Sequence, residues 1–203
     1  MKKLTKIVSL ALALCMVFAL GITANADSIT TSGGSGSTPV NLSTTVDGTI
    51  GGTPAATALS VTVPTALPMA MSQAGDVTTA TNCRIVNNSY GAVRVRSVTI
   101  NAVNNWTLTA FGAKSTLAGE KVDAKKLGFA MTIGGGVQLK TDSSNLVTQT
   151  LLAAPITGCY MTGIGNTSGN SVAIDYSAII TPLSTAVTNS TIANVVFVIE
   201  WDI

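Results

Sequence analysis

The sequence predicts an all-β protein built as a single antiparallel β-sandwich. Three observations support this fold class. Runs of β-branched residues recur between Gly, Asn and Pro residues, as is typical of strands separated by turns. Several runs alternate apolar and polar side chains, which gives each strand one buried and one solvated face. Helix signals are weak, and about seven strands in roughly 150 residues fit one domain.

The first 26 residues are predicted to be a secretory signal peptide. Lys2, Lys3 and Lys6 form the cationic start, residues 7–20 form the apolar stretch, and Ala24-Asn25-Ala26 is the small-residue cleavage site. A retained membrane anchor is the alternative, but the apolar stretch is short for a bilayer crossing. We therefore expect a secreted protein, extracellular or cell-wall associated, without membrane contact after cleavage.

Residues 27–56 are predicted to be a flexible tail, because Ser, Thr and Gly dominate them and Gly33-Gly34-Ser35-Gly36-Ser37 is typical of a linker. One stretch, at 39–46, interrupts this composition. There Val40, Leu42 and Val46 lie on one side of an alternating pattern, which indicates a candidate donor strand. Its partner edge is either in the same molecule or in another copy, and the sequence leaves both open.

The domain at 57–203 is predicted to be the sandwich, of the immunoglobulin-like or jelly-roll-like type. Its expected strands lie at 59–63, 77–86, 93–101, 106–111, 127–133, 172–180 and 192–203. In the third of these, Arg94 and Arg96 point to solvent before the alternation shifts near Ser97. The last strand is apolar on both faces at 195–199, so we expect it to be central or covered. One or two helical turns are expected at 118–126, and 145–154 is ambiguous.

Several kinds of catalysis are excluded because the 203 residues include no histidine. A histidine base, a histidine-ligated metal and a Cys/His nucleophile all need that side chain. Two carboxylate pairs, Glu120 with Asp123 and Glu200 with Asp202, are the remaining route to an enzyme, by glycoside hydrolysis. Glu200 and Asp202 are more simply explained as the solvated face of the last strand. We therefore predict a non-enzymatic protein without cofactor or metal.

The signal peptide changes the charge and the cysteine count. It holds three of the 11 basic residues and none of the nine acidic ones, so the mature chain has one more acidic than basic residue. No basic cluster remains that would indicate nucleic-acid binding. Cys15 is removed with the signal peptide, and Cys83 and Cys159 remain as either a disulfide or two buried thiols.

The two tryptophans carry the most specific remaining pattern. Trp106-Thr107-Leu108 and Trp201-Asp202-Ile203 both place an indole two residues before a branched aliphatic side chain, so in a strand the two side chains share a face. The simplest interpretation is a pair of core aromatic residues.

These motifs resemble those of the WxL proteins, secreted surface proteins of low-GC Gram-positive bacteria with two separated Trp-x-Leu motifs. Trp106 and Leu108 match the first motif, and Trp201 and Ile203 match the second with Ile in place of Leu. Residues 61–67 are similar to the start of the WxL domain, so the resemblance covers 57–203. It implies non-covalent binding to peptidoglycan or another cell-wall polymer, for surface display or adhesion.

The order of signal peptide, tail and β domain also resembles the camelysin-group subunits of biofilm fibres. This resemblance implies a self-assembling extracellular matrix subunit, in which a tail freed by signal cleavage completes the sheet of a neighbouring copy. The partner would then be a second copy of the chain and the donor strand would be 39–46.

Overall fold

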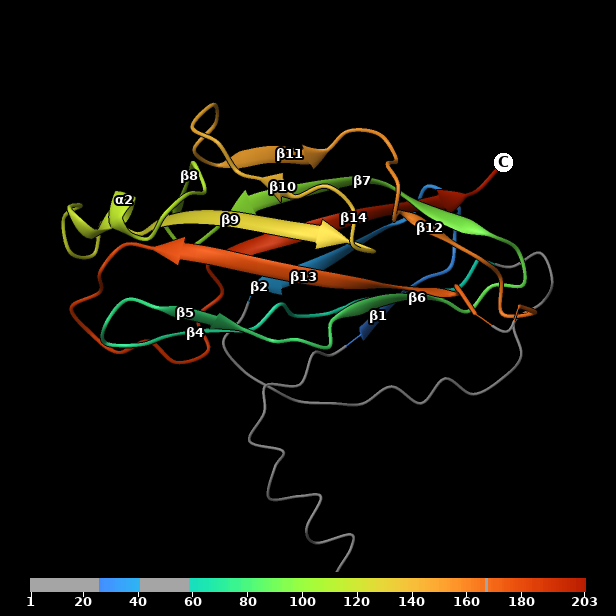
Figure 1. Ribbon diagram of the computed structural model, residues 1–203, viewed down its shortest axis with the longest axis horizontal. Helices are drawn as coiled ribbons and strands as arrows, with labels where there is room; N and C mark the ends of the chain where they lie inside the picture. The colour runs from blue at the N-terminus through green and yellow to red at the C-terminus, as the bar shows by residue number, and fades with distance from the viewer. Residues whose placement is uncertain (1–25, 41–58, 167) are drawn as a thin grey trace, which may run out of the picture.

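The computed structural model describes residues 26–40, 59–166 and 168–203. It is an all-β sandwich of two sheets packed face to face, with a small two-stranded sheet beside them (Figure 1), so the predicted fold class is confirmed. Residues 1–25 of the expected signal peptide lie outside the described residues, as do Leu42 and Val46 of the candidate donor strand.

The larger sheet has seven strands. Six follow the spatial order β1-β3-β6-β13-β9-β10, and β8 also pairs with β9 in the one parallel pairing within the described residues. Their bounds are β1 (Ala26–Ile29), β3 (Val61–Pro64), β6 (Arg84–Asn87), β13 (Ser171–Ile180), β9 (Lys126–Ile133), β10 (Leu139–Lys140) and β8 (Thr107–Thr109).

The smaller main sheet has five strands in the order β11-β7-β14-β2, and β12 also pairs with β7. Their bounds are β11 (Thr148–Leu152), β7 (Val93–Ala102), β14 (Ala193–Trp201), β2 (Ser35–Val40) and β12 (Tyr160–Met161). The expected central place of the last strand is confirmed, because β14 lies between β7 and β2. β4 (Met69–Met71) and β5 (Val77–Thr79) form the separate two-stranded sheet.

The core lies between the two main sheets and is filled by alternate side chains of their strands. Phe129 of β9 and Phe197 of β14 are fully buried there, each contributing about 1.5–3 kcal/mol by leaving water. The alternation in β7 shifts where the sequence predicts, because Val198 pairs with Ser97 and Ile199 with Val95. The extra residue at this β-bulge shifts the alternation, so β7 buries apolar side chains both before and after the bulge along the strand.

The strand expected at 77–86 is wrong as one element. It divides into β5 and β6, because two hydrogen bonds to Tyr176 end the first strand. The hydroxyl of Thr79 donates to the carbonyl of Tyr176, and the backbone N–H of Ala80 donates to the hydroxyl of Tyr176. These bonds fix the end of β5, and β6 then joins a different sheet, between β3 and β13.

The helical turns expected at 118–126 are also misplaced. The one helix in the described part of the chain, α2 (Ser115–Ala118), ends before most of that range. Asp123 and Lys125 have φ values of 62° and 52°, which a right-handed helix does not admit. The ambiguous stretch at 145–154 contains strand β11.

Candidate functional sites

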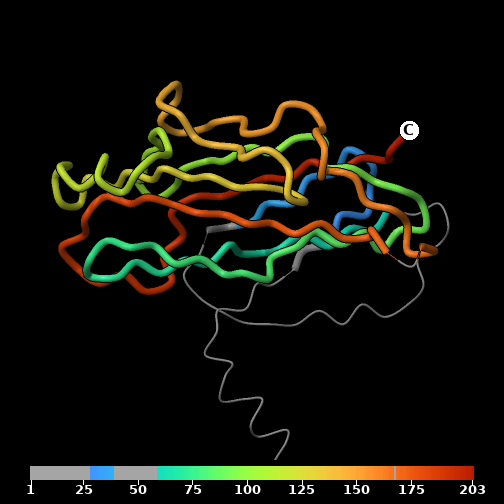
Figure 2. Tube along the Cα trace, viewed as in Figure 1, coloured from blue at the N-terminus to red at the C-terminus, as the bar shows by residue number. Residues whose placement is uncertain are grey.

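The N-terminal strands β1 and β2 are the edges of the two main sheets on the same side of the sandwich. β1 pairs with β3, and β2 pairs along β14 from Ala193 to Val198. Figure 2 shows this N-terminal segment beside the C-terminal strand. The segment therefore completes both sheets of the molecule.

Strand β2 is held by backbone pairing and by two inward positions. Gly36 is buried, and a Cβ atom there would lie 2.7 Å from Val63 and 3.3 Å from Ile29, so a larger residue does not fit without movement. The hydroxyl of Thr38 is buried and donates to the carbonyl of Pro64, which joins β2 to the end of β3 in the opposite sheet. Ser35 and Ser37 face solvent, so residues 35–38 of β2 bury little apolar side-chain area.

The prediction of a flexible tail at 27–56 is wrong for residues 27–40, which form most of β1 and all of β2. The rest of that range, 41–56, lies outside the described residues. Main-chain hydrogen bonds hold β2 on β14 although Ser and Gly are poor strand formers. Of the candidate donor strand, Val40 is the last residue of β2 and pairs with Ala193. The partner edge of the described part of the tail lies in the same molecule.

Trp106 is positioned by a tight turn after β7. Asn104 and Asn105 have φ values of 54° and 64°, and the N–H of Trp106 donates to the carbonyl of Val103 at 3.0 Å. Positive φ at both central residues is typical of a type I′ turn, and Asn adopts it more readily than most residues. Trp106 is 7% exposed and Leu108 is fully buried, so the first motif belongs to the core.

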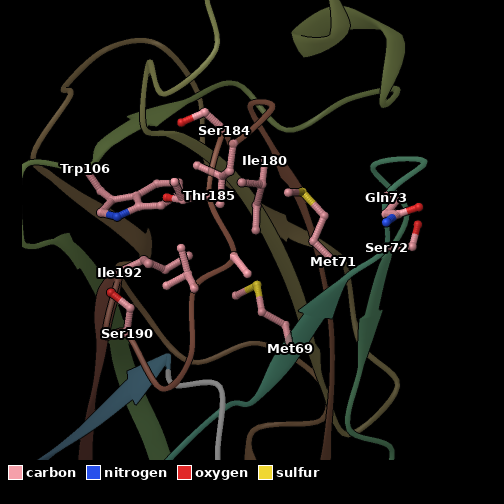
Figure 3. A pocket seen from close by; sticks show the side chains of 13 residues that line it. Met69, Met71, Ser72, Gln73, Trp106, Ile180, Ser184, Thr185, Ser190 and Ile192 are labelled. Carbon is pink, nitrogen blue, oxygen red and sulfur yellow. The ribbon is translucent and has the colours of Figure 1, made fainter.

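A pocket of about 460 Å³ lies against Trp106 (Figure 3). Met69, Met71, Ile180 and Ile192 converge with the indole around its centre. Its other described lining residues are Ser72, Gln73, Leu183, Ser184, Thr185, Ala186, Val187 and Ser190. The walls therefore come from β4 and the turn after it, from Trp106 after β7, and from the end of β13 and the chain between β13 and β14.

The two tryptophan motifs lie at opposite ends of the sandwich. Ala102 of β7 pairs with Ala193 at the Trp106 end, and Val93 pairs with Trp201 at the other. The length of β14 between them is about 26 Å at roughly 3.3 Å per residue. Trp201 packs partly against the core, whereas β14 ends there and Ile203 is fully exposed. The motifs do not form one joint site, and Trp201 and Ile203 do not share a buried face.

Arginines and carboxylates pair across the outer face of β7 and β14. Arg94 Nε is 2.8 Å from Glu200 Oε1, Arg94 Nη1 is 3.2 Å from Asp202 Oδ1, and Arg96 Nε is 3.6 Å from Glu200 Oε2. The hydrogen bond to Glu200 raises the pKa of Arg94. Glu200 and Asp202 thus lie on the solvated face, as expected, with arginine partners.

The other carboxylate pair has separate partners. Lys126 Nζ is 2.6 Å from Glu120 Oε1. Asp123 accepts hydrogen bonds from the N–H and the hydroxyl of Ser184, at 2.9 and 2.5 Å, and these lower the pKa of Asp123. Neither carboxylate lines the pocket within the described residues.

Cys83 and Cys159 are buried free thiols. The carbonyl of Cys83 accepts from Ile174 of β13, and that of Cys159 accepts from Val95 of β7, so the two are attached to different sheets. Burial raises the pKa of both thiols and of the neighbouring Tyr176 hydroxyl. Of the two alternatives open from the sequence, the structure has the buried thiols.

Within residues 26–40, 59–166 and 168–203, no cluster of three or more Cys, Asp or Glu side chains is arranged to hold a metal ion. No helix in that same part of the chain has the length and apolar character needed to span a membrane.

Comparison with protein-family models, curated proteins and solved structures found no match to this chain. The resemblance to the WxL proteins, and the resemblance in architecture to camelysin-group subunits, stay predictions.

Proposed function

We propose that this protein is a non-enzymatic, secreted surface protein that self-assembles into an extracellular matrix by exchanging its N-terminal strands between copies. The observation that carries the proposal is that residues 26–40 supply an edge strand to each main sheet. The edges beneath them, on β3 and β14, are templates for an identical segment from any copy.

The contacts of β2 suit exchange. They are mostly main-chain hydrogen bonds, so a strand from another copy makes the same bonds in the same register. The inward positions Gly36 and Thr38 bury little apolar side-chain area, so this part of β2 is released at lower cost than a core strand such as β7. An exchange in which each copy gives its segment to the next produces an open chain of subunits.

A two-pool cross-linking experiment tests the exchange. Ser37 and Val196 are directly opposed across β2 and β14. One pool of mature protein carries Ser37→Cys and the other Val196→Cys, so a disulfide between these positions requires two copies. We expect mixed pools to form such disulfides, and electron microscopy to show threads. Cross-linking only within a chain that carries both changes, with none between pools, contradicts strand exchange.

The matched control uses Thr99→Cys in place of Val196→Cys. Thr99 pairs with Val196 from the other side of β14, so it lies two strands from Ser37. We expect no cross-link between Ser37→Cys and Thr99→Cys pools. Equal yields from both combinations would indicate random collision rather than strand pairing.

Gly36→Val should abolish the exchange, because the added Cβ overlaps Val63. Ser35→Val is the matched control, since Ser35 is an exposed neighbour on the same strand. We expect threads and inter-pool disulfides to disappear with Gly36→Val and to persist with Ser35→Val. Threads from the Gly36→Val protein would show that assembly uses another surface.

The second candidate function is non-covalent binding to a cell-wall polymer, as the WxL resemblance implies. The observation that favours it is that Tyr90 and Tyr160, 62% and 47% exposed, lie at the same end as the partly buried Trp201. Gly91 lies directly against the Trp201 ring, which brings Tyr90 near it. Exposed aromatic rings offer an apolar contact with a polar tip.

Pelleting of the mature protein with purified cell-wall sacculi tests this second function. We expect Tyr90→Ala with Tyr160→Ala to reduce pelleting, because both side chains are exposed. Trp106→Phe is the control and should pellet normally, because Trp106 is buried at the other end. Failure of the unaltered mature protein to pellet would remove wall binding.

A further inference from the structure

The pocket beside Trp106 has the size of a small-molecule site. Its volume of about 460 Å³ lies in the range of roughly 300–1,000 Å³ that such sites occupy. None of its described lining residues belongs to β1 or β2, and the exposed tyrosines lie at the far end of the sandwich.

The chemistry of the walls selects for a neutral, apolar ligand. Within the described part of the chain, every lining side chain is uncharged. A charged ligand would lose hydration there without gaining an ion partner, which is costly. The indole of Trp106 and the thioethers of Met69 and Met71 instead offer polarisable contacts that adapt to a ligand's shape.

The walls are fixed from outside the pocket. The side-chain amide of Asn104, in the turn before Trp106, donates to the carbonyl of Thr191 at 2.8 Å. Asp123 holds Ser184 by two hydrogen bonds. The chain between β13 and β14 is thus tied at both ends of the stretch that lines the pocket, so the pocket is largely formed before a ligand arrives.

We propose that this pocket binds a small, neutral, apolar molecule, with its aliphatic or aromatic part against Trp106, Met69 and Met71. The hydroxyls of Thr185 and Ser190 lie among its lining groups and suit a ligand with one uncharged polar group.

Calorimetric titration of the mature protein with 1-hexanol and with hexanoate tests the proposal, because the two probes have equal chain length and differ in charge. We expect saturable binding of 1-hexanol, about tenfold or more tighter than hexanoate. In a Trp201→Phe background, 1-hexanol should also shift the fluorescence of Trp106. Absence of saturable binding, or equal affinity for both probes, would overturn the proposal.

Variants locate the binding in the pocket. Met71→Lys brings a charge into the lining and should weaken 1-hexanol binding about tenfold, whereas Met71→Leu keeps an apolar wall of similar volume and should bind nearly as the unaltered protein does. Thr185→Lys is a second charged variant at an exposed position, where folding tolerates change. Unchanged 1-hexanol binding in both lysine variants would show that the binding site lies outside this pocket and would contradict the proposal.

Discussion

Single residues at the ends of the strands fix the loops of this protein. Asp123 is the clearest case, since its carboxylate accepts two hydrogen bonds from Ser184 while its backbone has a φ of 62°. The backbone N–H of Asp123 also donates to the carbonyl of Pro182. One residue thus connects the loop before β9 to the chain that lines the pocket.

Asp123→Asn should make the protein less stable at neutral pH, and its stability should fall less as the pH is lowered. Asn tolerates positive φ, so the change leaves the backbone unstrained and removes the negative charge together with one of the two oxygens that accept from Ser184. Because the pKa of Asp123 is lower in the folded chain, the unfolded chain binds more protons in acid. The stability that the Asp123 carboxylate contributes is therefore present above about pH 4 and is lost as the pH falls through the folded-state pKa.

Urea unfolding across pH measures this effect. We expect the midpoint of Asp123→Asn to lie below that of the unaltered protein at about pH 6, and the two midpoints to converge as the pH falls through the lowered pKa of Asp123. Ser184→Ala removes one of the two donors and should have a smaller effect of the same sign. A midpoint difference that stays constant with pH would show that the charge is not involved.

At the scale of elements, the turn between β7 and β8 decides where Trp106 lies. Asn105→Val should lower the free energy of unfolding by about 1–2 kcal/mol, because a β-branched side chain is strained at a φ of 64°. Asn105→Gly is the matched control and should leave stability nearly unchanged, since Gly adopts positive φ freely. Denaturant unfolding followed by tryptophan fluorescence compares them, and equal stability of both variants would contradict this role of the turn.

The elements that could be predicted from sequence are those whose side chains alternate over many residues. β7, β9, β13 and β14 follow the expected ranges closely, and the shift near Ser97 is the bulge of β7. Strands β1 and β2 could not be predicted, because main-chain pairing with an open edge holds them and their side chains carry little pattern. The short strands β4, β10 and β12 depend likewise on a neighbouring backbone.

At the scale of the whole molecule, the candidate sites were only partly predictable. Trp106 and Leu108 were expected to share a face, and both are buried. The pocket could not be predicted from sequence, because its walls combine β4, the turn after β7 and the chain before β14. The opposite positions of Trp106 and Trp201 also follow from strand pairing alone, which motif spacing does not show.

Cys83 and Cys159 are each buried on a different sheet, and this burial predicts how the two thiols react. Cys83 and Cys159 are 3% and 0% exposed, and burial raises the pKa of both thiols, so the thiolate that reacts is scarce. With a thiol reagent such as dithionitrobenzoate, we expect almost no reaction in native buffer and reaction of both thiols in denaturant. No reaction in denaturant would indicate a disulfide instead.

The antiparallel pairing of β2 with β14 has a mechanical consequence. Ser35, which starts β2, is opposite Val198, close to where β14 ends. Tension that pulls the start of β2 away from the end of β14 therefore loads one backbone pair at a time, as in opening a zipper, instead of shearing all pairs together. This edge would peel under a small force, whereas β14, held by β7 on its other side, would stay in place.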